Sequence, residues 1–171
     1  SVKAGIIKNG CYVVSVRQRP EVMQVLQQAA LLCKAEFHMA DVSRAQNIRY
    51  GVAKQYFTYE QYKKLAITMT GQVQIENAVA AVEIIITLGR LGFPVKEEQL
   101  RQGLLETRWR GRFDVIGKKP LFIADGAHNE DAARKLADSI RFYFTNRRII
   151  YIMGMLKDKE YDKVIQDTYT L

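Results

Sequence analysis

The chain contains few of the residues from which disulfide frameworks and zinc centres are built. Its 171 residues include two cysteines, Cys11 and Cys33, and two histidines. Both cysteines stand in apolar surroundings and lack the paired spacing of a metal site, so we expect them to be reduced and structural. The sequence therefore argues against a disulfide-stapled secreted domain and against a zinc module.

Long hydrophobic runs are also missing. Residues 78–88 form one of the longest apolar stretches, but Glu83 interrupts it and it is too short to span a bilayer. The first residues show no signal-peptide pattern. Because 48% of the residues are hydrophobic, the chain can still build a packed core. We therefore expect a globular protein of the cytoplasm with no membrane partner.

A phosphate-binding loop of the Gly-x-x-x-x-Gly-Lys-Ser/Thr type does not occur in the sequence. Gly5 and Gly10 do not substitute for it, because neither stands in that pattern. Whatever nucleotide chemistry the chain takes part in, these residues cannot hold the phosphates alone.

The excess of positive charge has no concentrated location. The net charge is +8, from 26 basic and 18 acidic residues, and the basic residues are scattered, with pairs such as Lys63–Lys64 and Arg147–Arg148 far apart in sequence. No basic run is interleaved with aromatic residues. A cleft for an anionic small molecule explains this charge about as well as DNA does, so a basic nucleic-acid-binding module stays open as an alternative.

Hydrophobic periodicity and turn residues predict an α/β chain. The predicted strands are 11–16, 37–39, 56–59, 67–69, 113–116, 121–124 and 148–153, and the predicted helices are 21–34, 74–91, 96–105, 129–143 and 159–168. The order of the later elements predicts a hairpin, followed by a parallel sheet covered by helices. Such a sheet would be incomplete as a domain, so we expect the chain to be a fragment.

The predicted strand at 121–124 ends abruptly in polar residues. In α/β proteins this end of a strand is where ligands bind. Asp125 could accept hydrogen bonds from ribose hydroxyls, bind a cation or bind an ammonium, or it could instead cap the next helix. His128 could bind phosphate or transfer a proton, although a structural hydrogen-bonding role is the commoner one for a lone histidine.

Two further groups of residues carry suitable chemistry. Arg112 has the planar donor fork that matches phosphate or carboxylate, and its neighbour Trp109 could stack on a base, although we favour a role as an anchor. Gln74 and Asn77 stand where a long helix begins, so their amides could read the edge of a purine or cap the helix. The polar cluster at 157–159 is either a functional loop or a solvated one.

Five blocks of the sequence, in order, resemble the folylpolyglutamate synthase family, including the bifunctional dihydrofolate synthases, within the Mur ligase superfamily. They are KAGIIK at 3–8, GQVQIENA at 71–78, WRGRF at 109–113, DGAHN at 125–129 and GMLKDK at 154–159. The resemblance implies that residues 1–109 are the latter part of a central ATPase domain. It also implies that residues 110–171 are the first part of a Rossmann-like C-terminal domain.

The resemblance further implies an ATP-dependent ligase. Such an enzyme phosphorylates a folate or dihydropteroate carboxylate, and the amine of L-glutamate then attacks the acyl phosphate. ATP and Mg²⁺ are the implied cofactors, the full-length enzyme is expected to be a monomer, and the fragment itself is expected to be inactive. Another Mur-type amide ligase, acting on a peptidoglycan precursor or on cyanophycin, is the nearest alternative.

The same resemblance assigns roles to individual residues. Lys3 corresponds to a lysine that is carbamylated and helps to hold magnesium, which suits a cation that prefers oxygen ligands. Asn77 corresponds to a position near adenine, Arg112 to a phosphate contact and Asp125 to the ribose or interdomain nucleotide site. His128 corresponds to a catalytic residue beside the phosphates and the glutamate pocket.

Overall fold

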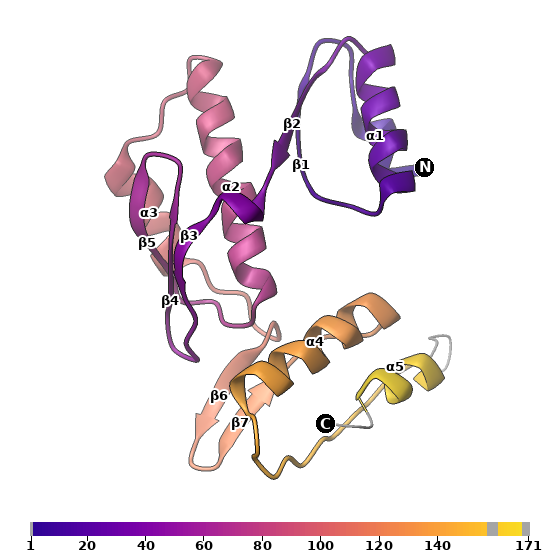
Figure 1. Cartoon of the computed structure of the whole chain (residues 1–171), viewed down its shortest axis with the longest axis vertical. Helices are drawn as coiled ribbons and strands as arrows, with labels where there is room; N and C mark the ends of the chain where they lie inside the picture. The colour runs from indigo at the N-terminus through magenta and orange to yellow at the C-terminus, as the bar shows by residue number, and fades with distance from the viewer. Residues whose placement is uncertain (1, 157–160, 169–171) are drawn as a thin grey trace.

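The computed structural model describes residues 2–156 and 161–168, and Figure 1 shows their arrangement. The elements follow in the order η1 (Val2–Ile6), β1 (Tyr12–Val16), α1 (Pro20–Leu32), β2 (Glu36–Ala40), η2 (Val42–Arg44), β3 (Gln46–Arg49), β4 (Gln55–Tyr59), β5 (Tyr62–Ile67), α2 (Val73–Arg90), α3 (Glu97–Glu106), β6 (Asp114–Lys118), β7 (Leu121–Ala124), α4 (Glu130–Tyr143) and α5 (Tyr161–Thr168). We call η1 to α3 the first unit and the stretch from Phe113 to α5 the second unit. Residues 107–113 connect them, so Phe113 is both the last residue of the connection and the first of the second unit. The polar cluster at 157–159 lies outside the described residues.

The first unit contains a parallel strand pair and an antiparallel sheet. β1 pairs in parallel with β2, and α1 provides the crossover that a parallel connection requires. β3, β4 and β5 form an antiparallel sheet in that order. Both sets of strands contact α2, which therefore forms the centre of this unit.

The main hydrophobic core lies between α2 and the antiparallel sheet. Phe57, Leu65 and Val79 are fully buried there. Tyr59 is also fully buried, and its hydroxyl donates a hydrogen bond of 3.0 Å to the buried Glu83 carboxylate of α2. Burial, together with this carboxylate, raises the pKa of Tyr59 to about 12. The interior acid thus has a partner that stays protonated at neutral pH.

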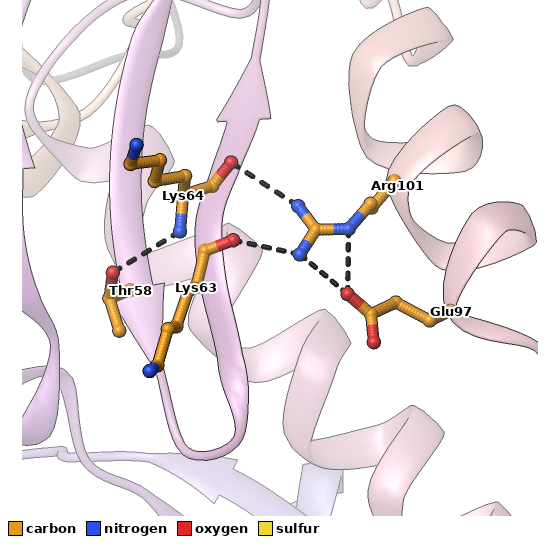
Figure 2. Close-up of polar contacts among 5 residues, drawn as sticks. All are labelled: Thr58, Lys63, Lys64, Glu97 and Arg101. Carbon is orange, nitrogen blue, oxygen red and sulfur yellow. Dashed lines mark hydrogen bonds and ion pairs between the residues drawn. The ribbon is translucent and has the colours of Figure 1, made fainter.

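Arg101 attaches α3 to the antiparallel sheet. Its guanidinium donates hydrogen bonds to the carbonyl oxygens of Lys63 and Lys64 on β5, at 2.8 and 3.3 Å, and pairs with Glu97 one turn earlier on α3 (Figure 2). The neighbouring Lys64 N–H in turn bonds the hydroxyl of Thr58 on β4 at 3.2 Å. One planar fork therefore joins a helix to a strand by several hydrogen bonds.

The second unit has a smaller core of its own. β6 and β7 form an antiparallel hairpin, as the sequence predicts, and α4 and α5 contact each other. Phe113, Leu136 and Ile140 form the buried cluster. Asn129 caps the start of α4, and its side-chain oxygen accepts the N–H of Ala132 at 2.9 Å.

The predicted strand at 148–153 is wrong, and so is the parallel sheet to which it would belong. In the described part of the second unit, only β6 and β7 pair as strands. Ile150 and Ile152 are 84% and 80% exposed, although the continuous apolar run 149–153 is typical of a buried strand. A strand needs a hydrogen-bonding neighbour, and β7 pairs only with β6 here.

The other predicted helices and strands are present, with two corrections in the 36–70 region. The five predicted helices are present to within two residues at each described end, and six strands occur near the predicted positions. The strand predicted at 67–69 instead covers Tyr62–Ile67, and β3 was expected to be a polar loop. β3 is almost entirely polar, so only its pairing with β4 makes it a strand. Among the described helices, none has the length and apolar character needed to cross a membrane.

Candidate nucleotide cleft between the two units

A cleft of about 400 Å³ lies where the first unit meets the second. It is lined by Met69, Gly71, Val73, Gln74, Asn77, Trp109, Arg112, Phe113, Asp125, Asp131, Ala132, Lys135, Leu136 and Ser139. These residues come from the start of α2, the connection between the units, the end of β7 and α4 (Figure 1). The N-terminal end of α2 lines the cleft, and the partial positive charge of a helix N-terminus favours anions.

Three of the residues predicted to bind nucleotide come together in this cleft. Asn77, Arg112 and Asp125 all line it, although the first and the last lie 48 positions apart in sequence. Lys3 and His128 are not among its lining residues. The cleft thus combines an amide, a guanidinium and a carboxylate.

The Asp125 carboxylate organises the backbone around the cleft. One oxygen accepts the N–H of Phe113 at 2.7 Å, and the other accepts the N–H of Ala127 at 2.8 Å. The alternative role of Asp125 as a helix cap is wrong, because Asn129 caps α4. Each carboxylate oxygen keeps a second lone pair, so Asp125 can still accept a ligand hydroxyl.

Arg112 supplies the cleft with a positive charge that no acid among the described residues pairs with. The other lining cation, Lys135, pairs with Asp131 one turn earlier on α4 at 3.3 Å. Within residues 2–156 and 161–168, Arg112 forms no such ion pair. An exposed guanidinium in a concave site suits an anionic ligand.

Trp109 does not serve as the anchor that we expected. Its side chain is 68% exposed although it lines the cleft, so its ring surface is accessible to a ligand. Phe113 provides the anchor instead, since it is 3% exposed and packs against two rings of α4 and its end. The distances between ring centroids are 5.5 Å to Tyr143 and 6.3 Å to Phe144. One aromatic residue of the connection is thus buried and the other is free to stack.

The amides at the start of α2 do not cap the helix. No side chain makes a capping hydrogen bond there, and Asn77 instead donates to the Gln74 side-chain oxygen at 3.1 Å. Gln74 is 6% exposed, whereas Asn77 is exposed. The bond to the buried Gln74 uses only one N–H of the Asn77 amide. Asn77 therefore retains its oxygen acceptor and a second N–H for a ligand.

His128 lies in the turn between β7 and α4. Its Nδ1 is 2.7 Å from the carbonyl oxygen of Gly126, and the ring is exposed. Because a carbonyl oxygen only accepts, this contact requires the proton on Nδ1 and leaves Nε2 as the acceptor in the neutral ring. The local hydrogen bond supports the structural role, and Nε2 stays available for chemistry.

Lys3 stands apart from the residues that line the cleft. It is exposed on η1, which contacts α1. Across the described ranges, no group of three or more His, Cys, Asp or Glu side chains could hold a metal ion. Because Mg²⁺ is commonly held by one or two carboxylates together with substrate phosphates and waters, the role of Lys3 as a carbamylated magnesium ligand stays a prediction.

Thr70, Gln55 and Tyr143 also shape the cleft although the sequence does not single them out, whereas it does single out Gly71. Thr70 donates to the Phe113 carbonyl at 2.7 Å, which joins the two units directly. Gly71 has a φ of +97°, and a Cβ there would lie 3.4 Å from the Phe113 Cβ. Gln55 and Tyr143 form a hydrogen bond of 2.9 Å between the units. Gly71 is a usable signal because it stands just before the predicted helix. The hydrogen-bond partners of Thr70, Gln55 and Tyr143 are distant in sequence, so the sequence does not reveal them.

Known proteins resemble this chain over nearly all of its length. Residues 111–168 match the Mur ligase, glutamate ligase domain. The dihydrofolate synthase/folylpolyglutamate synthase of Bacillus subtilis is 31% identical over 99% of this chain and 41% of its own length. The folylpolyglutamate synthase of Lacticaseibacillus casei is 30% identical over 93% of this chain and 38% of its own length.

Solved structures show the same relationship. A folylpolyglutamate synthase in complex with AMPPCP and folate superposes with a TM-score of 0.87 at 25% identity, covering 98% of this chain and 42% of that one. The folylpolyglutamate synthase of Thermotoga maritima gives a TM-score of 0.75 at 27% identity, covering 96% of this chain and 40% of that one. The chain therefore spans about two fifths of the length of these relatives. By its sequence blocks, fold and relatives, the chain belongs to the folylpolyglutamate synthase family of the Mur ligase superfamily.

Proposed function

We propose that this chain supplies one side of the ATP site of a ligase that adds L-glutamate to folate or dihydropteroate. The observation that carries the proposal is the convergence of Asn77, Arg112 and Asp125 on one cleft between two units with separate cores. The relatives named as folylpolyglutamate or dihydrofolate synthases support the choice of reaction.

The cleft offers a suitable group to each part of ATP. Arg112 has the charge and fork geometry to bind phosphate oxygens, and Asp125 can accept ribose hydroxyls. Asn77 can present both a donor and an acceptor to a purine edge, while the exposed ring of Trp109 can stack on the base. These contacts would position the nucleotide and stabilise its charge, the two main protein contributions to phosphoryl transfer.

The proposed reaction has two steps. A carboxylate oxygen of the pteroate attacks the γ-phosphorus of ATP, which forms an acyl phosphate and releases ADP. The glutamate amine then attacks the acyl carbon, so that a C–N bond forms, the C–O bond to phosphate breaks and inorganic phosphate leaves. His128 can assist the second step, since its Nε2 is the acceptor in the tautomer that Gly126 selects.

The proposal extends to the organisation of the whole protein. We assign residues 1–109 to a central ATPase-type domain and residues 110–171 to a C-terminal domain. Separate hydrophobic cores and the family match beginning at residue 111 support this division. A monomer acting in the cytoplasm completes the proposal, and the two unpaired cysteines are compatible with a reducing compartment.

Magnesium is the second cofactor of the proposal. Many phosphoryl transfers use Mg²⁺ to neutralise charge between the phosphates. Because the described side chains do not form a metal cluster, we assign no step to a metal held by them. Carbamylation of Lys3 stays a prediction, and ¹³C NMR of the protein in ¹³C-bicarbonate tests it through a carbamate signal that Lys3→Ala should abolish.

The decisive assay uses the intact protein with ATP, L-glutamate and either dihydropteroate or folate. We expect ADP release that depends on both the pteroate and glutamate, with a product one glutamate heavier. ADP release with a peptidoglycan precursor or cyanophycin instead would identify another Mur-type ligase. Saturable, steeply salt-dependent binding of an oligonucleotide without ATP turnover would favour the nucleic-acid-binding alternative.

A further inference from the structure

A completely buried glutamine links the two units behind the cleft. Gln55 stands at the start of β4 and has no exposed surface. Its amide nitrogen donates to the carbonyl oxygens of Met69 and Gly71, at 2.8 and 3.0 Å. Its amide oxygen accepts the hydroxyl of Tyr143 from α4 at 2.9 Å. Both N–H groups and the oxygen of this side chain are therefore engaged.

The two carbonyls that Gln55 holds belong to the wall of the cleft. Met69 and Gly71 both line it, and they lie just before α2. Between them, Thr70 donates its hydroxyl to the carbonyl of Phe113 at 2.7 Å. The 69–71 segment is thus held by the first unit through Gln55 and by the second unit through Phe113.

The second unit also meets this segment through Tyr143. Its ring packs against Phe113, and burial raises the pKa of its hydroxyl to about 12, so the group stays a donor at neutral pH. Because Gln55 bonds both Tyr143 and the 69–71 segment, a movement of α4 relative to β4 would disturb the cleft wall. A satisfied buried polar network fixes relative position more narrowly than apolar contact does.

We propose that Gln55 and Tyr143 are positioning residues that set the separation of the two cleft walls and thereby the affinity for nucleotide. The inference rests on the proposed ATP site, and neither residue lines the cleft. Removing the Tyr143 hydroxyl leaves the Gln55 oxygen buried without its donor, which loosens the junction while Arg112 and Asp125 stay unchanged.

The test compares two tyrosines that each lose one side-chain hydrogen bond, Tyr143 to an amide oxygen and Tyr59 to a carboxylate. Tyr143→Phe removes the bond to Gln55, and Tyr59→Phe removes the bond to Glu83 inside the first unit, away from the lining residues. In the intact protein we expect Tyr143→Phe to raise the KM for ATP roughly fivefold, as for the loss of one net hydrogen bond. Tyr59→Phe should leave that KM within roughly twofold even where it lowers Tm.

Two additional readouts separate positioning from general destabilisation. In Gln55→Leu, adding Tyr143→Phe should raise the KM no further, because their shared bond is already absent. In Tyr143→Phe, amide hydrogen exchange should accelerate at residues 69–75 and 110–114, whereas Tyr59→Phe should not accelerate it there. Equal KM changes in both tyrosine variants, or unchanged KM and exchange in Tyr143→Phe, would overturn the proposal. If the wild type turned over no ATP, the proposed function would fail, while the exchange data would still test the link.

Discussion

Asp125 accepts the backbone N–H of Phe113 at 2.7 Å, so the carboxylate at the end of β7 fixes the residue with which the second unit begins. Phe113 has a φ of 49°, a left-handed conformation that is uncommon for a bulky residue. Its carbonyl is held by Thr70 on the other side. The connection between the units is therefore defined by hydrogen bonds on both sides of one buried aromatic residue.

This arrangement predicts that Asp125→Asn destabilises the protein even without ligand. An asparagine has one acceptor oxygen, whereas Asp125 accepts from Phe113 and Ala127 with two. We expect the free energy of unfolding to fall by about 1–3 kcal/mol in urea titrations. The control is Asp131→Asn, which removes an exposed pair with Lys135 and should cost less than about 1 kcal/mol. Equal losses of unfolding free energy in the two variants would contradict the claim that Asp125 stabilises the fold by holding Phe113 and Ala127.

The two aromatic residues of the connection should respond in opposite ways. Trp109→Ala should lower the affinity for ATP and leave Tm nearly unchanged, because the ring is 68% exposed and lines the cleft. Phe113→Ala should lower the free energy of unfolding by about 3–5 kcal/mol, because it removes a ring from the smaller core. Thermal melts and nucleotide titrations of both variants check this. A large drop in Tm for Trp109→Ala would restore the anchor interpretation.

Arg101 should contribute more to stability than an ordinary surface arginine. Arg101→Ala removes bonds to the Lys63 and Lys64 carbonyls as well as to Glu97, so we expect a loss of about 1–3 kcal/mol. The matched control is Arg134→Ala on α4, whose pair with Glu130 is confined to the helix surface and should be worth about 0.5 kcal/mol. Chemical unfolding measures both, and indistinguishable losses would show that Arg101 does not hold α3 to β5.

Alkaline pH should destabilise the protein through Tyr59 and Tyr143. In the folded chain both have a pKa of about 12, against 10.0 for an ordinary tyrosine. The unfolded chain therefore releases these protons first, and the associated stability, complete below pH 10, is lost as the pH rises from 10 toward 12. Urea midpoints across this range should fall less steeply in the Tyr59→Phe/Tyr143→Phe double variant. Parallel curves for the variant and the wild type would contradict the prediction.

The sequence predicts local elements well because their signals are local. The α2 helix follows from apolar residues at helical spacing, and the β6–β7 hairpin follows from a turn between two apolar runs. The segment 148–153 has the same apolar character, yet no described strand pairs with it. Composition therefore indicates that a segment can be a strand, and only its neighbours decide whether it is one.

For the candidate site, too, the sequence identifies single residues, and only the structure shows which of them lie together. Asn77, Arg112 and Asp125 could each be chosen from residue type and position, and the family resemblance assigns a role to each. That the three line one cleft is known only from the structure. Gln55 and Tyr143 could not be selected from the sequence, since they lie 88 positions apart and meet only after both units have folded. Trp109 and Phe113 show the same limit, because sequence alone does not reveal which of the two is buried.

The central claim is that the cleft between the two units binds nucleotide through Arg112. Calorimetric titration of the intact protein with AMPPCP tests it most directly, with Arg110→Ala as the control because Arg110 is an exposed neighbour outside the cleft lining. We predict that Arg112→Ala weakens binding at least roughly tenfold, as for a lost charge-assisted hydrogen bond, while Arg110→Ala binds like the wild type. Equal affinity in Arg112→Ala and wild type would contradict the account.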